Sequence, residues 1–417
     1  MVSDEKTARL TRVINKLQSV PYQINTKLLC HLVKCKDIYH ASGLLMPSIL
    51  ASIDRTEGTV RLKHHYLNDK EMKKYFSLKD LINIWIKNIQ SACYEQYILK
   101  LADALQNYNL YFPTFLDFRG RNYRYGPFHY HERDLVRSLI LFAQSGVTDT
   151  PPDKGSQGIR TFMASTAFHY SKYWKNYNEG IIWFIKNIHE CPDLNSNKAD
   201  IVLDRLANLA RKARHPFQFL SSVITLKNRD SDKIARTPIH LDASASAYQM
   251  LSYLLGNITM ARNTNLISEN NKINNIYEII DSDFKKYIER KYGEHIITRY
   301  VCSLFDRDII KNIFMPIVYG KSKFSTAIDL LGKIGSYMVV EDFKTIIKEC
   351  YNFWESEYKD MRNLMHLVAS ISWVSGFINK PVIYSTEYWI TVQDYIIMEP
   401  VKITVKYQTH GMVLILK

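Results

Sequence analysis

Apolar residues recur at three- and four-residue intervals along most of the chain, which places them on one face of a helix. This spacing predicts helices over residues 5–36, 78–108, 158–190, 198–212, 214–226, 246–257, 272–290, 296–315 and 322–368. We expect the packing of their apolar faces to form the core.

Three regions depart from the helical spacing. Between 110 and 145, an alternating run around Tyr123 predicts strand and turn, followed by a helix from Arg133 to Gln144. From Trp373 to Leu416, Val, Ile, Thr and Tyr recur between Gly and Pro, which is typical of strands. Residues 146–158 are rich in Pro, Asp, Thr and Ser and predict a surface loop. The predicted fold class is therefore mixed α/β and mainly helical.

Composition narrows the possible functions. The 417 residues can form about two or three subdomains around a sizeable core. A net charge of +14 favours polyanionic partners. No apolar run approaches the ~20 residues of a membrane-spanning helix, so we expect no membrane insertion. The six cysteines form no Cys-x-x-Cys pair, which indicates free thiols rather than disulfides or zinc ligands. No Gly-x-x-x-x-Gly-Lys-Ser/Thr loop is present, which disfavours a P-loop ATPase.

The segment from Arg307 to Gly320 carries the sharpest chemical pattern. Arg307 and Lys311 stand four residues apart, so a helix would aim both side chains at one spot. There Arg can fork onto phosphate oxygens, and Lys adds a point charge. Tyr319 follows about two turns later and would lie near the sugar and base of a nucleoside triphosphate. The alternative is a solvated helix face, because Arg-x-x-x-Lys is a common pattern. Pro316 removes a backbone donor and is expected to kink this helix.

A carboxylate upstream suits a metal ion. Thr237 to Gln249 begins as an apolar, strand-like run that brings Asp242 to its end and then turns into small residues and a helix. Mg²⁺ prefers hard oxygen ligands and is usually shared with substrate phosphates, so Asp242 is a candidate ligand. The alternative is an acid in a strand-end turn that binds no metal.

Further upstream, Arg119, Gly120 and Arg121 lie between apolar residues. The glycine permits near approach of a nucleic-acid backbone, and the arginines supply charge for its phosphates. For Arg121, a buried ion pair with Asp117 is the alternative.

These three segments, in this order, resemble the single-subunit RNA polymerases of bacteriophages and mitochondria. The matching residues are Asp117, Gly120 and Arg121 in an Asp-x-x-Gly-Arg signature, Asp242 as the first metal-binding Asp, and Arg307, Lys311, Tyr319 and Gly320 in the nucleotide-binding helix. The resemblance implies DNA-directed RNA synthesis with Mg²⁺, a DNA template, an RNA product and ribonucleoside triphosphates.

The resemblance also implies a role for each matching residue. Asp242 would bind Mg²⁺, and Arg307 and Lys311 would hold the triphosphate and stabilise developing charge. Tyr319 would check the sugar and base. Gly320 would leave room for the template strand. Arg119 and Arg121, with Gly120 between them, would contact nucleic-acid phosphates. Asp242, Lys311 and Tyr319 would thus act in catalysis.

The same resemblance implies a right-hand polymerase with palm, fingers and part of the thumb. The expected domains are 1–110 with lead-in and thumb-like helices, 111–262 as palm, 263–372 as fingers, and 373–417 as a strand-rich tail. The family's second metal-binding carboxylate, in a His-Asp motif, has no match between Gly320 and Lys417. We therefore expect a truncated polymerase that is weakly active or inactive, or one completed by a separate polypeptide.

Abundant Lys, Asn, Ile and Tyr fit codons from an AT-rich genome, and they favour a mitochondrial protein encoded in the organelle or on its plasmid. Two other functions stay open. A DNA polymerase of the same superfamily uses a related nucleotide helix and would incorporate deoxyribonucleotides. A non-catalytic remnant would bind nucleic acid in a salt-sensitive way without extending it.

Overall fold

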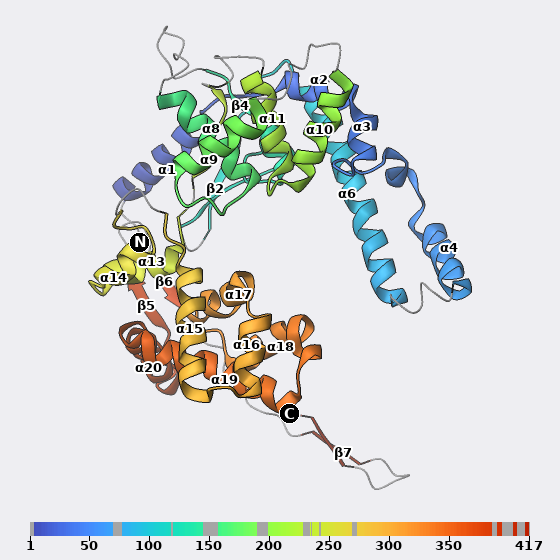
Figure 1. Cartoon of the computed structure of the whole chain (residues 1–417). Helices are drawn as coiled ribbons and strands as arrows, with labels where there is room; N and C mark the ends of the chain where they lie inside the picture. The colour runs from blue at the N-terminus through green and yellow to red at the C-terminus, as the bar shows by residue number, and fades with distance from the viewer. Residues whose placement is uncertain are drawn as a thin grey trace. The chain divides into compact units, whose positions relative to one another are not determined.

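The computed structural model describes residues 4–69, 77–117, 120–144, 157–189, 199–227, 234, 236–241, 243–268, 273–385, 390–393, 403–406 and 413–416. The chain divides into two compact units (Figure 1). We call residues 11–242 with 271–273 the N-terminal unit, and residues 1–10, 243–270 and 274–417 the C-terminal unit. Each is described by itself.

Helices make up most of the N-terminal unit. They are α1 (Asp4–Gln18, which starts in the other unit), α2 (Thr26–Lys34), α3 (Lys36–Ala41), α4 (Arg55–Asn68), α6 (Leu78–Leu105), α7 (Asp134–Ser138), α8 (Gln157–Tyr170), α9 (Tyr177–Phe184), α10 (Ala199–Lys212) and α11 (Pro216–Lys227), with a 3-10 helix at Ser48–Ser52 and a π-helix at Ile185–His189. Two antiparallel strand pairs complete it: β1 (Tyr22–Ile24) with β4 (Ile140–Phe142), and β2 (Thr114–Leu116) with β3 (Asn122–Arg124).

The core of the N-terminal unit joins segments that are far apart in sequence. Leu32, Ile98 and Leu220, from α2, α6 and α11, are fully buried in one apolar cluster. The buried Asn25 amide donates hydrogen bonds to the Ser138 carbonyl and the Ser221 hydroxyl, at 3.5 and 3.0 Å. Because buried polar groups need partners, these bonds fix the start of α2 against α7 and α11.

The C-terminal unit contains α13 (Ser246–Leu254), α14 (Ile258–Asn263), α15 (Ile276–Tyr292), α16 (Ile296–Leu304), α17 (Arg307–Ile317), α18 (Lys323–Ile334), the 3-10 turn η3 (Gly335–Tyr337), α19 (Val340–Glu357) and α20 (Lys359–Phe377). Two hairpins follow, β5 (Val382–Ser385) with β6 (Ile390–Gln393) and β7 (Ile403–Lys406) with β8 (Val413–Leu416). Phe284, Phe314 and Phe353 meet at the core with ring centroids 5.3 to 5.8 Å apart, which ties α15, α17 and α19 together.

Several predicted elements are confirmed. The chain is mainly helical, the helix predicted over 78–108 is α6, and those predicted over 198–212 and 214–226 are α10 and α11. The tail contains the predicted strands. No helix in the described part of the chain is long and apolar enough to cross a membrane.

The single helix predicted over 5–36 is wrong. It is interrupted after Gln18 by β1, and α2 begins afresh at Thr26. Pro21 accounts for the interruption, because it lacks an N–H and drives the preceding residue into an extended conformation. Asn25 then caps the new helix by accepting a hydrogen bond from the Leu28 N–H, at 3.3 Å.

Other predicted helices are too long. The one predicted from Arg133 ends at Ser138 and is followed by β4, and the one predicted over 158–190 divides after Tyr170. The helix predicted over 296–315 divides between α16 and α17. The helix predicted over 322–368 divides at η3 and again at Tyr358, between α19 and α20. Conversely, Trp373, expected in a strand, lies inside α20. The predicted loop at 146–158 lies outside the described residues except at its last two positions, which begin α8.

The strand predicted to lead into Asp242 is also wrong for its described part. Residues 237–241 belong to none of the sheets that the structure describes, and the Leu241 side chain is 90% exposed. The apolar residues of this segment therefore do not form a strand that pairs with another strand in the described structure.

Candidate functional site

The helix α17 presents two different faces. Asp306 begins it by accepting a hydrogen bond from the Ile309 N–H, at 2.8 Å. Ile310, Ile313, Phe314 and Ile317 are buried in the core of the C-terminal unit. The core therefore fixes the rotation of the helix about its axis, and with it the direction of the opposite, cationic face.

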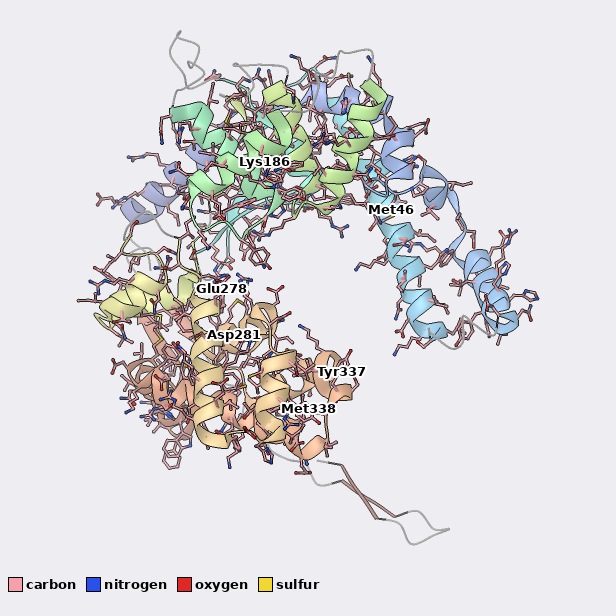
Figure 2. All side chains as sticks on the ribbon, in the orientation of Figure 1. Met46, Lys186, Glu278, Asp281, Tyr337 and Met338 are labelled. Carbon is pink, nitrogen blue, oxygen red and sulfur yellow. The ribbon has the colours of Figure 1, made fainter. Side chains whose placement is uncertain are left out.

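The two cations of that face meet over a single aromatic ring. The Arg307 Cζ lies 5.8 Å from the centroid of the Tyr277 ring, and the Lys311 Nζ lies 5.9 Å from it. Both distances are within cation–π range. Tyr277 lies in the first turn of α15, just before Glu278 (Figure 2), and is 5% exposed. Both positive charges therefore lie against the same aromatic ring.

Arg307 keeps an unused donor. Its Nη1 donates to the neighbouring Asp308 carboxylate at 2.9 Å, but its Nε is buried and, within the described structure, has no hydrogen-bond partner. Leaving a buried donor unpaired costs about 1–3 kcal/mol. Lys311 has no ion-pair partner among the residues that the structure describes. An anionic ligand at the exposed end of these side chains would neutralise both charges.

The Tyr319-Gly320 pair closes the end of α17. Gly320 has φ +83°, its N–H donates to the Ile317 carbonyl at 2.8 Å, and the Lys321 N–H donates to the Pro316 carbonyl at 3.2 Å. This is a Schellman C-cap, which favours glycine because a Cβ is strained at positive φ. The helix passes through Pro316 to Ile317. Tyr319 is 67% exposed and can contact a ligand.

Burial and two neighbouring residues set the pKa of the Tyr277 hydroxyl. Burial raises the pKa of Tyr277, the positive charge of Arg307 lowers it, and the nearby Tyr319 raises it. Tyr277 therefore stays neutral at pH 7. Sequence reasoning missed this residue, because a tyrosine in the first turn of a predicted helix looks like any other core aromatic. The Asn275 cap, whose side chain accepts from the Tyr277 N–H at 3.2 Å, was the available local signal.

Asp117, Gly120 and Arg121 of the Asp-x-x-Gly-Arg segment lie between β2 and β3 in the N-terminal unit. The Asp117 Oδ1 accepts from the Arg121 N–H at 2.9 Å, and the Asp117 N–H donates to the Arg121 carbonyl at 3.0 Å. Gly120 has φ +77°. The Arg121 side chain is exposed and, within the described structure, has no ion pair. The carboxylate therefore organises the turn and leaves the guanidinium available. Arg119 lies outside the described residues.

Asp242 also lies outside the described residues. In the part of the chain that the structure describes, no group of three His, Cys, Asp or Glu residues could hold a metal ion. The expected meeting of Asp242 with Arg307 and Lys311 stays a prediction, because these residues belong to different units.

These features place the chain among mainly helical, strongly basic proteins with a cationic site suited to a polyphosphate. Residues 153–375, more than half of the chain, match the family model described as DNA-dependent RNA polymerase. The chain belongs to that family.

Named relatives agree. The chain is 34% identical to a probable DNA-directed RNA polymerase of Zea mays, over 98% of this chain and 39% of the relative. It is 24% identical to a probable DNA-directed RNA polymerase of Neurospora crassa, over 92% of this chain and 43% of the relative. It is 26% identical to the mitochondrial DNA-directed RNA polymerase of Schizosaccharomyces pombe, over 55% of this chain and 19% of the relative. The chain thus spans about two fifths of the length of the first two relatives.

Proposed function

We propose that the chain provides the nucleotide-binding part of a DNA-directed RNA polymerase that performs template-dependent ribonucleotidyl transfer. One observation carries the proposal: Arg307 and Lys311 converge over the Tyr277 ring. A triphosphate supplies several oxygens to such a pair. The family match supports the same reaction.

In this reaction the RNA 3′-hydroxyl attacks the α-phosphate of the incoming nucleotide, and pyrophosphate leaves. Arg307 forks onto phosphate oxygens, and Lys311 places a second positive charge beside them. Their charges stabilise the negative charge that develops on the transferred group. The exposed Tyr319 contacts the sugar and base, and Gly320 leaves room for the template strand.

Mg²⁺ is the cofactor of this proposal, with Asp242 as a protein ligand. A single carboxylate combined with substrate phosphates and water is an ordinary environment for this ion. When bound, Mg²⁺ neutralises phosphate charge and supports the displacement. Arg119, Gly120 and Arg121 contact template or hybrid phosphates in the proposal.

The right-hand arrangement belongs to the proposal as well. Residues 111–262 form the palm, 263–372 the fingers, and 1–110 include part of the thumb. A mitochondrial setting is favoured by the relatives that carry the word mitochondrial in their names.

Equilibrium binding of ATP tests the nucleotide site. Charge-assisted hydrogen bonds contribute about 1.5–3 kcal/mol, so Arg307→Ala and Lys311→Ala should each weaken binding by about ten- to a hundredfold. Lys344→Ala is the matched control, because Lys344 is an exposed cation of the same unit whose ion-pair partner is the exposed Glu341. Unchanged affinity in both site variants would rule out this location.

Primer extension on a DNA template separates the candidate activities. An RNA polymerase incorporates ribonucleotides in preference to deoxyribonucleotides, and a DNA polymerase shows the reverse preference. A non-catalytic remnant binds the template without incorporating either nucleotide. Arg307→Ala should lower whatever incorporation the protein shows at low nucleotide concentration, in line with its weaker nucleotide binding.

A further inference from the structure

The carboxylate of Asp281 has one oxygen that no neighbouring group uses. Asp281 lies in the first half of α15 (Figure 2), and its Oδ2 accepts a hydrogen bond from the Lys285 Nζ at 2.9 Å. Its Oδ1 is buried and has no hydrogen-bond partner in the part of the chain that the structure describes. A buried acceptor without a donor is unfavourable, so we expect a donor to reach the Oδ1.

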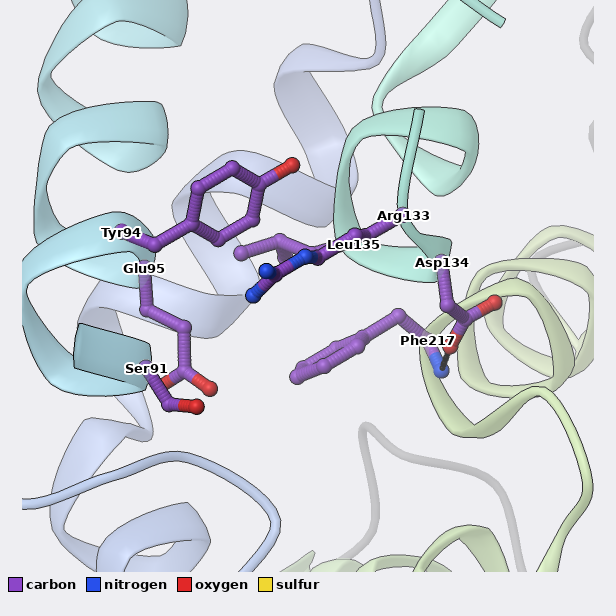
Figure 3. Close-up of a pocket in the computed structure, with 7 residues that line it drawn as sticks. All are labelled: Ser91, Tyr94, Glu95, Arg133, Asp134, Leu135 and Phe217. Atoms are coloured by element: carbon purple, nitrogen blue, oxygen red, sulfur yellow. Dashed lines mark hydrogen bonds between the residues drawn. The ribbon is translucent and has the colours of Figure 1, made fainter. Parts of the chain in front are cut away.

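Two other carboxylates of the chain show the usual pattern, in which both oxygens accept hydrogen bonds. Asp134 accepts from the Phe217 N–H at 2.6 Å, as the dashed line in Figure 3 marks, and from the Gln218 side-chain amide at 2.8 Å. Glu349 likewise accepts through both of its oxygens. The unused oxygen of Asp281 is therefore a departure that needs an explanation.

Arg307, in the nucleotide site, has the complementary unused group. Its Nη1 donates to the Asp308 carboxylate at 2.9 Å, but its Nε is buried and has no acceptor among the described residues. A ligand that comes from solvent meets the exposed end of the side chain and does not reach a buried Nε. We therefore expect the acceptor for the Nε to lie inside the C-terminal unit.

Contacts on both sides of Asp281 place it beside Arg307. One turn earlier on α15, the Tyr277 ring centroid lies 5.8 Å from the Arg307 Cζ. One turn later, the Lys285 Nζ donates to the carbonyl of Phe305, two residues before Arg307, at 3.0 Å. Residues four apart lie on the same face of a helix, so Tyr277, Asp281 and Lys285 form one row along the start of α17.

The two unused atoms complement each other, because the Nε–H is a donor and the Oδ1 is an acceptor. The described structure contains no direct hydrogen bond between them. A buried water molecule typically makes about two to four hydrogen bonds, so one water can serve both atoms. We propose that Asp281 positions Arg307 through one buried water, which accepts from the Nε–H and donates to the Oδ1. This inference rests on the nucleotide site proposed above and adds a positioning residue to it.

A held Nε sets the direction in which the rest of the guanidinium acts. The group is planar and rigid, so fixing one nitrogen restricts the orientation of the other two. Arg307 then presents its Nη groups to a phosphate with less loss of side-chain freedom on binding. Without Asp281, the guanidinium samples more orientations, and nucleotide binding must order it again.

Equilibrium titration with ATP across a set of variants tests this role. Asp281→Ala should weaken ATP binding about three- to tenfold, because a water-mediated hydrogen bond to a charged group is lost. In the Arg307→Ala protein, which has no guanidinium to position, the same substitution should change affinity by less than about twofold. In the Lys311→Ala protein it should still weaken binding about three- to tenfold. Asp281→Leu removes the same oxygen, fills more of its space and replaces the alanine variant if that variant does not fold.

Asp283→Ala is the matched control. Asp283 lies two residues further along the same helix, and its carboxylate lies 3.7 Å from the Lys286 Nζ. Residues two apart in a helix do not share a face, so this substitution removes an aspartate–lysine pair without touching the row beside α17. It should leave ATP affinity unchanged. Thermal unfolding verifies that each variant is folded.

The outcomes separate this inference from the proposed function. If neither Arg307→Ala nor Lys311→Ala weakens ATP binding, the proposed site is wrong, and the role of Asp281 falls with it. If Arg307→Ala weakens binding and Asp281→Ala does not, the site stands and the positioning role is overturned. The role is also overturned if Asp281→Ala weakens binding as much in the Arg307→Ala protein as in the unsubstituted one, because Asp281 then acts through general packing. Equal losses in Asp283→Ala and Asp281→Ala overturn it as well.

Discussion

Replacing Tyr277 by leucine tests whether the ring beneath Arg307 and Lys311 holds both cations in position. The substitution removes the π face that lies 5.8 Å from the Arg307 Cζ and 5.9 Å from the Lys311 Nζ. It keeps an apolar side chain at a position that is 5% exposed. Without the ring, each cation samples more conformations, and nucleotide binding must order them again.

The expected magnitude follows from the environment of the cations. A cation–π contact contributes about 0.5–1 kcal/mol at an exposed site and about 2 kcal/mol when desolvated. The Arg307 side chain is 20% exposed, which lies between these limits. Losing both contacts should therefore weaken ATP binding by about 1–2 kcal/mol, or about five- to thirtyfold. Tyr277→Phe keeps the ring and should bind ATP within about twofold of the unsubstituted protein.

The assay is equilibrium titration with a fluorescent ATP analogue, accompanied by thermal unfolding. Tyr292→Leu is the matched control, because Tyr292 also carries a lysine near its ring, at 5.8 Å, but lies about 22 Å further along α15. The control should lose stability and keep its affinity. A folded Tyr277→Leu protein with unchanged affinity would show that the Tyr277 ring does not position the two cations. So would a Phe variant as weak as the Leu variant, because the hydroxyl would then be the active part.

Three further outcomes are expected. Gly320→Ala should lower the free energy of unfolding by about 1–2 kcal/mol in a denaturant titration, because a Cβ is strained at φ +83°. Gly332→Ala is the control: it lies inside α18 with open space around it and should be neutral or stabilising. Lys291→Met should lower the free energy of unfolding by about 1–3 kcal/mol, because Glu349, 3% exposed, loses its cation at 2.6 Å but keeps the Tyr287 and Tyr292 hydroxyls as donors; an unchanged unfolding midpoint would contradict this. Burial, with nearby positive charge, lowers the pKa of His169 to about 3. The unfolded chain therefore binds more protons, and the free energy of unfolding should fall as the pH drops from about 6.5 towards 3. Thermal melts between about pH 6.5 and 3 should show a weaker pH dependence for His169→Gln.

Periodicity located the helices but not their ends. α6 and α17 follow from apolar spacing, because each must bury one face. The break between α16 and α17 depends on Asp306, which caps the second helix at 2.8 Å. Aspartates also occur on solvated helix faces, so a single aspartate in the sequence does not identify the start of a helix. Likewise, Pro21 interrupts the first predicted helix, whereas Pro316 lies inside the last turn of α17, which ends one residue later at Ile317.

The residues around the candidate site were less predictable than its motif. The i, i+4 spacing of Arg307 and Lys311 is local and can be recognised in the sequence. The ring that both contact belongs to Tyr277 on another helix, 30 positions before Arg307. No pattern within α15 marks Tyr277 as different from Phe284, which is core. The pairing of His169 with His215 is equally non-local, since it arises where α8 meets the start of α11. Such juxtapositions come from tertiary packing, which one-dimensional spacing does not encode.

The packing of α17 also explains why the cationic face is a rigid one. Phe314 is fully buried against Phe284 and Phe353, and its carbonyl accepts the Tyr248 hydroxyl at 2.8 Å. The Tyr248 hydroxyl in turn accepts from the Trp354 ring N–H at 3.1 Å. Because α13, α15 and α19 all hold α17 at this level, the helix cannot roll without breaking buried hydrogen bonds and aromatic contacts. The positions of Arg307 and Lys311 are therefore fixed by the packing of α17 before any ligand arrives, so an anion meets both charges with little reorganisation of the protein.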